Sequence, residues 1–98
     1  MDKKFFSFLG LARKAGKIVL GYDNIVKRQK NIKLLILSNE AVERTKRNIN
    51  SLNKPVINID LSKKEFGKLM GAGEVSVVAV TDNNFAEQLN IIAKRSNE

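Results

Sequence analysis

Three apolar runs, each followed by polar residues and then a helical pattern, restrict this chain to a small set of folds. The runs cover residues 34–37, 56–59 and 75–80. Continuous apolar runs, unlike alternating ones, are typical of strands that are covered on both faces. Strand, cap and helix in repeated succession build layered α/β folds in which helices cover a sheet.

The polar residues after each run predict where the next helix begins. Ser38 and Asn39 follow the first run. Residues 82–84 follow the third run, and Glu87 lies three residues after Asn84. Ser62 and Glu65, after the second run, have the spacing of a capping box, in which two side chains satisfy free backbone N–H groups at a helix start.

The first third of the chain adds a helix whose apolar residues recur from Phe5 to Ala15, with Asp2 as its N-cap and Gly16 at its end. A short strand over residues 17–20 follows, and then a second helix that begins near Tyr22. We therefore predict one domain over residues 1–98. Its expected fold is α/β: a three-layer α/β/α sandwich with a four-stranded mixed sheet and about five helices.

The composition excludes most kinds of active site. The chain has no cysteine and no histidine, which removes thiolate nucleophiles, the usual zinc ligands and the side chain most often used for proton transfer at neutral pH. Asp60, Glu74 and Asp82 form no recognisable carboxylate pair, and each has a capping or loop explanation. We therefore expect no enzyme, no metal site and no cofactor.

No apolar segment has the length needed to cross a membrane. FFSFLGLA runs into Arg13 and Lys14 without a signal-peptide cleavage site. We therefore expect a soluble, cytoplasmic protein.

Positive charge is concentrated in the first half of the chain. Residues 1–54 contain 13 Lys and Arg against 4 Asp and Glu, whereas residues 55–98 contain 5 against 6. This asymmetry indicates an anionic partner, which could be nucleic acid or an acidic protein. An anionic membrane fits least, because no helix combines a large apolar face with a cationic one. Arg13, Lys14 and Lys17 flank Gly16 and are candidates for phosphate contacts.

The stretch LGYDNIVKRQK places polar and cationic side chains on one face of the second helix. Asp23 and Lys27 are one turn apart, as are Asn24 and Arg28. Such groups can read base edges, and the free backbone N–H groups after Gly21 can bind a phosphate. The alternative is a solvated face on which Asp23 pairs with Lys27. The side chains expected to face inward are Tyr22, Ile25, Val26 and Gln29.

The stretch EFGKLMGAGEV contains a second candidate site. Gly67 lies in an expected helix, where glycine costs about 1 kcal/mol relative to alanine, so we predict that another backbone segment approaches it closely. Gly71 and Gly73 then form a turn. The spacing is not that of a P-loop or a dinucleotide site, because it follows a helix. The turn is either a helix C-cap with a connection or a loop that packs against a ligand.

Taken together, LGLARKAGKIVLG, GYDNIVK, KLLILSNEA, PVINID and EFGKLMG resemble the bacterial YlxQ-like proteins, which belong to the superfamily of the archaeal ribosomal protein L-seven-Ae. The match runs in order over nearly the whole chain. Proteins of this superfamily are small α/β/α sandwiches. They bind the tandem sheared G·A pairs of kink-turn RNA with the start of the second helix and the loop before the last strand.

The resemblance implies one RNA site made from both candidate stretches. In such proteins the loop packs apolar groups against an extruded nucleotide, and Val75 is the best apolar candidate here. The strongest binders have Asn followed by Glu where this chain has Asp23 followed by Asn24, which implies a different affinity or motif preference. With the nearby basic residues, the expected RNA-binding residues are Arg13, Lys14, Lys17, Gly21, Tyr22, Asp23, Asn24, Lys27, Arg28, Lys68, Gly71, Ala72, Gly73, Glu74 and Val75.

We therefore predict a monomeric, non-enzymatic protein that binds structured, kink-turn-like RNA and is associated with ribosomes or ribosomal RNA. The alternative is a protein-interaction module whose basic half docks on an acidic partner. A third possibility is the RNA-recognition part of a modifying enzyme, because this fold also occurs fused to methyltransferases. The 98 residues contain no catalytic domain of that kind.

Overall fold

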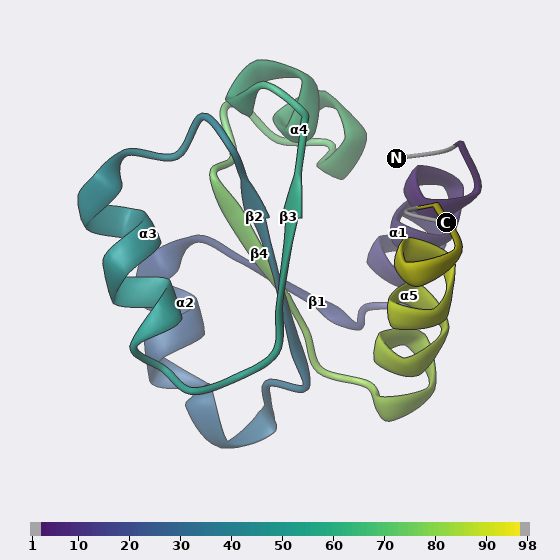
Figure 1. Cartoon of the computed structure of the whole chain (residues 1–98), viewed down its shortest axis with the longest axis horizontal. Coiled ribbons are helices and arrows are strands. Elements are labelled where there is room, and N and C mark those ends of the chain that lie inside the picture. The colour runs from purple at the N-terminus through teal and green to yellow at the C-terminus, as the bar shows by residue number, and fades with distance from the viewer. Residues whose placement is uncertain (1–2, 97–98) are drawn as a thin grey trace.

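The computed structural model describes residues 3–96, and these form a sheet with helices on both sides (Figure 1). The elements, in chain order, are α1 (Lys3–Lys14), β1 (Ile18–Leu20), α2 (Tyr22–Lys27), the 3₁₀ helix η1 (Gln29–Asn31), β2 (Leu34–Ser38), α3 (Glu43–Asn50), β3 (Val56–Ile59), α4 (Lys63–Met70), β4 (Val77–Val80) and α5 (Asn83–Ser96). The prediction of an α/β fold with four strands and about five helices is confirmed.

The sheet is mixed, with the strand order β1-β4-β2-β3. β4 runs antiparallel to both of its neighbours, whereas β2 and β3 run parallel. Every residue of the two central strands, β2 and β4, is buried. Burial on both faces explains why their sequences are continuously apolar. β3 lies at one edge of the sheet and is only partly buried.

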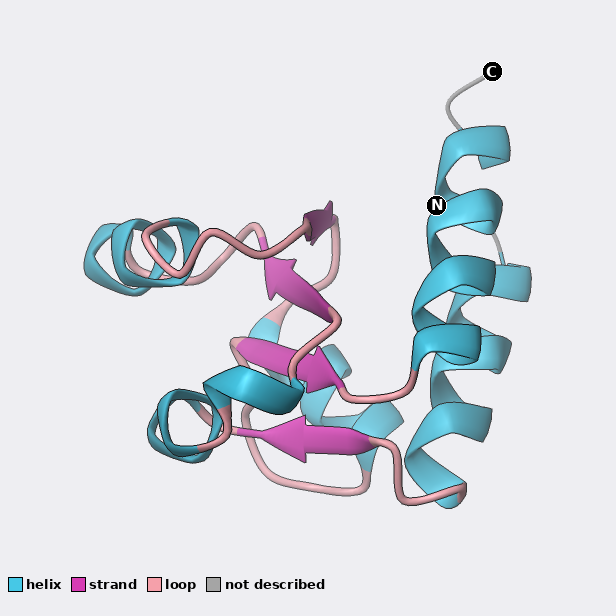
Figure 2. Ribbon diagram, turned by 90° about the horizontal axis from the view of Figure 1, so that it is seen from below, coloured by secondary structure: helices cyan, strands magenta, loops and turns pink. Residues whose placement is uncertain are grey.

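Helices cover both faces of the sheet and give the molecule its three layers (Figure 2). α1, α4 and α5 pack on one face, where Phe5, Phe66 and Leu89 are fully buried. α2 and α3 pack on the other face through Ile25 and Ile49. Successive residues of β2 alternate between these two cores. The predicted α/β/α sandwich is therefore confirmed.

Two strands start later than the sequence predicts. β1 begins at Ile18 and not at Lys17, and β4 begins at Val77 and not at Val75. The backbone N–H of Val75 donates to the carbonyl oxygen of Lys63 (3.0 Å) at the start of α4. This bond takes Val75 out of the strand ladder and ties the preceding loop to α4.

The predicted cap of the third helix is wrong. α3 follows Val42 and has no side-chain cap. Ser38 is fully buried, and its hydroxyl donates to the carbonyl oxygen of Leu61 (2.6 Å). The side-chain amide of Asn39 donates to Asp60 Oδ1 (2.7 Å). Both side chains therefore join the end of β2 to the segment after β3. Neither of them accepts a hydrogen bond from the free backbone N–H groups at the start of α3.

The predicted cap of α4 is confirmed, and of the three polar residues predicted to cap α5 only Asp82 does so, because Asn83 and Asn84 lie within the helix. Asp2, the predicted N-cap of α1, lies outside the described residues. Ser62 Oγ accepts a hydrogen bond from the backbone N–H of Glu65 (3.0 Å). Asp82 Oδ2 accepts one from the backbone N–H of Phe85 (2.9 Å). At the other end of α4, Gly71 adopts a left-handed conformation (φ 69°) and ends the helix.

Gly67 confirms the predicted close approach of another backbone segment. A Cβ atom at this position would overlap the carbonyl oxygen of Gly73. The backbone N–H of Ala72 also donates to the carbonyl oxygen of Gly67 (2.8 Å). Backbone contacts therefore hold residues 71–76, which we call the glycine loop, against the last turns of α4.

Replacing Gly67 by Ala should destabilise the fold, although alanine is the better helix former. Overpacking against the Gly73 carbonyl costs roughly 1–3 kcal/mol of unfolding free energy. Gly10→Ala is the matched control, because no atom lies within 4 Å of the added Cβ, and it should stabilise α1 by up to about 1 kcal/mol. Urea denaturation measures both changes. Equal effects of the two substitutions would contradict the close approach at Gly67.

Candidate nucleic-acid interface

The start of α2 and the glycine loop meet at one end of the sheet. Leu20, the last residue of β1, pairs with Val78 of β4, so α2 begins beside the strand into which the glycine loop leads. A cavity of about 350 Å³ lies between the two segments. The predicted site residues that line this cavity are Gly21, Tyr22, Ala72, Glu74 and Val75.

Gly21 sets the direction in which the chain leaves β1 for α2. Its φ of 86° and ψ of 142° lie in a region that is essentially restricted to glycine. The side-chain amide of Asn24 donates to the carbonyl oxygen of Leu20 (3.0 Å) and braces the same turn. This bond uses the Nδ2 atom of Asn24, whose Oδ1 atom is an acceptor on an exposed residue.

The exposed face of α2 carries the predicted polar and cationic side chains. Ile25 is fully buried, as predicted. Gln29 is exposed, contrary to the prediction, because α2 ends at Lys27 and the chain continues as η1. Within residues 3–96, Asp23 and Lys27 form no ion pair, so the expected alternative of a mutually neutralised pair is absent there. The exposed side chains are Asp23, Asn24, Lys27 and Arg28.

The glycine loop presents mostly backbone and small side chains to the cavity. Val75 does not project from the loop as the sequence suggested, because its side chain is 7% exposed and packs in the core. The loop is nevertheless positioned by that burial, since Val75 anchors its end. The exposed residues of the loop are Gly71, Ala72, Gly73 and Glu74.

Arg13 is part of the fold and is not a free surface cation. Its Nε atom donates to the carbonyl oxygen of Met70 (3.0 Å), the last residue of α4. Arg13 therefore supports the helix end from which the glycine loop starts. Lys14 and Lys17 are exposed, and Lys17 precedes the end of β1 that is opposite the cavity.

The structure thus separates the predicted residues into three groups. One group lines the cavity and a second lies on the exposed face of α2 beside it. The third group does not line the cavity and consists of Arg13, Lys14, Lys17, Lys68, Gly71 and Gly73.

Sequence reasoning missed several residues that complete the cavity. Thr45 is the most informative of them, because α3 contributes it from the middle of a largely charged segment. The available signal was its spacing, because Thr45 lies one helical turn before the apolar Ile49, which is fully buried. The packing of α3 beside α2 then places Thr45 at the cavity. The others are Leu20, Ser76 and Val77.

Within residues 3–96, no Asp and Glu side chains gather in a group that could hold a metal ion. In the same part of the chain, every helix is too short or too polar to cross a membrane.

The fold and the arrangement of the two segments define a class of protein. Residues 3–90 match the Ribosomal protein L7Ae/L30e/S12e/Gadd45 family, and the chain belongs to this family. The predicted resemblance is therefore confirmed.

Two individual proteins illustrate the relationship. The chain is 34% identical over 92 residues to the RNA-binding protein YlxQ of Bacillus subtilis (strain 168), a match that covers 88% of this chain and 91% of that protein. It is also similar to a solved structure described as a protein with unknown function from Bacillus halodurans C. That similarity has a TM-score of 0.85 and 28% identity, and it covers 95% of this chain and 99% of the other.

Replacing Arg13 by Met should lower the free energy of unfolding by roughly 1 kcal/mol, because the Met70 carbonyl loses its donor while the apolar stem is kept. Lys14→Met, at the exposed neighbouring position, should change it by less than about 0.5 kcal/mol. Thermal and urea denaturation of both variants measure the difference. If both substitutions were neutral, Arg13 would have no role in holding the end of α4.

Proposed function

We propose that the protein binds structured RNA of the kink-turn type between the start of α2 and the glycine loop. The observation that carries this proposal is the cavity of about 350 Å³ between these segments, flanked by the exposed face of α2. Membership of the L7Ae/L30e/S12e/Gadd45 family and the identity to an RNA-binding protein support RNA as the ligand class.

The cavity suits a single nucleobase that has left its stack. A base needs flat or apolar surface against its faces and polar atoms at its edges. Tyr22, half-buried at the start of α2, and Leu20, half-buried at the end of β1, supply the first kind of surface. Thr45 and Ser76 supply hydroxyl groups that can donate or accept at the edge. The glycine loop contributes the small side chain of Ala72 and the carboxylate of Glu74 to the same cavity.

The exposed face of α2 would read guanine edges beside the cavity. Asn24 presents its Oδ1 acceptor, which suits the N2 amino group of guanine. Lys27 can donate to guanine O6 or to a phosphate. Asn24 is a neutral acceptor where the strongest binders have a carboxylate, and neutral hydrogen bonds are weaker than charge-assisted ones. We therefore expect lower affinity for the guanine step than such binders have.

The proposed function requires binding alone and no chemical reaction. A protein that binds only the bent form of an RNA shifts the population toward that form by its differential affinity. The net charge of +8 adds attraction to phosphates of any sequence. We propose that the protein acts in this way as a monomer in the cytoplasm, on ribosomal RNA or RNA of similar structure.

Lys27→Ala should weaken binding to a kink-turn RNA by roughly 1–3 kcal/mol and binding to a plain duplex of equal length far less, because base-edge contacts carry sequence information. Lys4→Ala is the control, since Lys4 is an exposed cation on α1, across the sheet from α2. Calorimetric titration of the unmodified protein and both variants with both RNAs, at one stated salt concentration, measures all six affinities.

Two results would count against the proposal. If Lys27→Ala and Lys4→Ala lost the same small affinity for both RNAs, the face of α2 would be only a solvated basic surface. If the unmodified protein bound polyglutamate as tightly as either RNA and without preference for the kink-turn, the protein-interaction alternative would take its place.

A further inference from the structure

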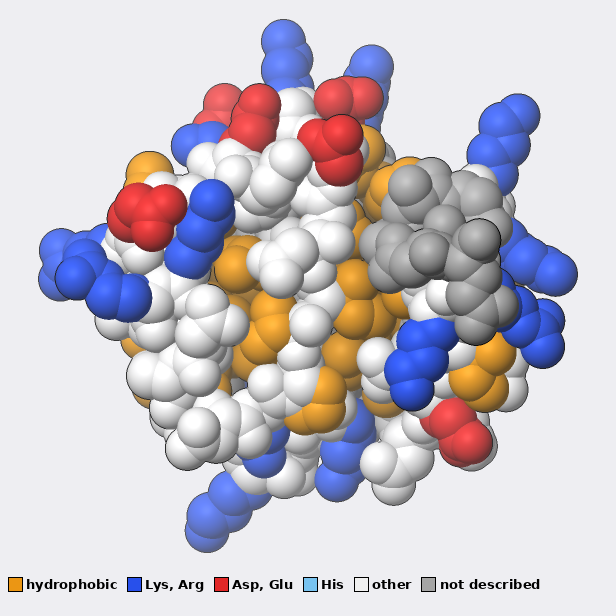
Figure 3. Space-filling view, in the orientation of Figure 1, with side chains coloured by type: hydrophobic (Ala, Val, Ile, Leu, Met, Phe, Trp, Pro, Cys, Tyr) orange, Lys and Arg blue, Asp and Glu red, His pale blue; other side chains and the backbone are white. Residues whose placement is uncertain are grey.

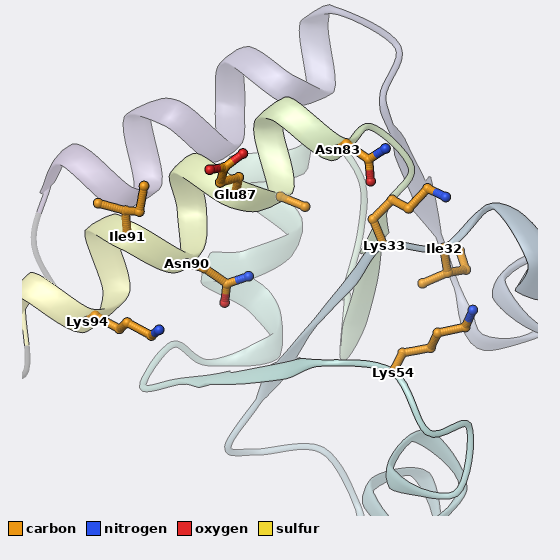
Figure 4. A pocket seen from close by; sticks show the side chains of 9 residues that line it. Ile32, Lys33, Lys54, Asn83, Glu87, Asn90, Ile91 and Lys94 are labelled. Carbon is orange, nitrogen blue, oxygen red and sulfur yellow. The ribbon is translucent and has the colours of Figure 1, made fainter.

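A second cationic surface lies at the opposite end of the sheet from the cavity. It is a groove of about 770 Å³ between α5 and the starts of β2 and β3 (Figure 4). Its ionisable and amide side chains are Lys33, Lys54, Asn83, Glu87, Asn90 and Lys94.

Three separate segments bring the lysines of this groove together. The backbone N–H of Lys33 donates to the Val80 carbonyl oxygen (2.8 Å), which fixes Lys33 beside the end of β4. Lys54 precedes Pro55, whose carbonyl oxygen accepts a hydrogen bond from a backbone N–H of β2 (2.8 Å). Figure 4 shows Lys94 pointing from α5 toward the gap, while Lys33 and Lys54 lie together on the other side.

The positive charge of the groove is largely uncompensated. None of the three lysines forms an ion pair within the part of the chain that the structure describes. Glu87 is the one carboxylate among the lining residues. Lys and Arg side chains project all around the margin of the face shown in Figure 3, the lower margin included. A surface with several unpaired cations attracts a ligand that carries many negative charges more strongly than a ligand that carries one.

Cationic residues connect the groove to the start of α2. No acidic residue lies between Asp23 and Glu40. Residues 27–30 line a shallow hollow around η1, and Ile32, two positions further along, lines the groove. The cations of this stretch are Lys27, Arg28, Lys30 and Lys33.

The cavity and the groove lie at the two ends of β4. Val77, at the start of β4, lines the cavity, and Val80, at its end, is bonded to Lys33. Three strand steps of about 3.3 Å, roughly 10 Å in all, separate these two residues. Lys33 and Lys54 are therefore the groove residues nearer to the α2 site, whereas Lys94 is carried by α5 on the other face of the sheet. An RNA stem would reach both sites by passing the end of the sheet at which β2 and β3 begin.

We propose that the groove binds the phosphate backbone of an RNA stem that leaves the α2 site. This inference rests on the proposed function and adds a contact that does not depend on sequence. Lysines and amides, with few apolar or aromatic groups, suit phosphates. They suit a protein partner less well, because lysine is depleted from the cores of protein interfaces.

Two triple variants with the same change in charge test the proposal. Affinity for a kink-turn RNA is measured over a range of salt concentrations, once with a short stem and once with a longer one. The groove variant carries Lys33→Gln, Lys54→Gln and Lys94→Gln. The control variant carries Lys3→Gln, Lys4→Gln and Lys64→Gln, all at exposed positions outside the groove.

The groove variant should reduce the slope of log affinity against log salt by about 2, since each phosphate contact contributes roughly 0.7–0.9. It should also lose the extra affinity that the longer stem gives to the unmodified protein. The control variant should keep both. The single variant Lys94→Gln, at an exposed position of α5, repeats the test in a less altered protein. It should produce about a third of the change in slope.

Equal slopes for the groove and control variants would overturn this inference and leave the effect of Lys27→Ala, and with it the proposed function, intact. Failure of the unmodified protein to prefer a kink-turn over a plain duplex would instead remove the proposed function itself. Loss of polyglutamate binding by the groove variant, with RNA binding unchanged, would overturn the inference in favour of an acidic protein partner.

Discussion

The antiparallel pairing of β1 with β4 is the interaction on which the candidate site depends. It places Leu20, from the first quarter of the chain, opposite Val78, from the last quarter. The chain turns into α2 on one side of this pair and arrives from the glycine loop on the other. Gly21 allows the first turn through its positive φ, and Gly67 allows the glycine loop to lie against α4. The cavity therefore exists because two backbone segments are held close.

The sequence predicted the features that depend on local patterns. Continuous apolar runs identified β2 and β4 because both strands are covered on two faces, and the cost of glycine within a helix pointed to the contact at Gly67. The features that were missed depend on contacts between distant segments. Val75 leaves its strand because its N–H bonds to Lys63, and nothing in the local sequence indicates that bond. The position of Thr45 beside α2 has the same explanation.

Charge and shape contribute differently to the proposed RNA contact. The excess of lysine and arginine draws any polyanion to the surface, and salt weakens this attraction. Discrimination among RNAs requires groups fixed in position, which the fold supplies through the short bond from Asn24 to Leu20 and through the packing of Ile25 beneath the exposed face of α2. A site that combines a fixed reading face with exposed lysines nearby would let specificity and affinity change separately.

The central claim is that α2 and the glycine loop form one RNA-binding surface. Backbone amide chemical shifts, recorded while a kink-turn RNA is added to the labelled protein, test it most directly. The claim predicts saturable shifts at residues 21–28 and residues 71–76 together, with smaller shifts along the groove beside α5. Shifts confined to the groove, or spread evenly over the lysine-bearing surface while both of those segments stay unchanged, would contradict it.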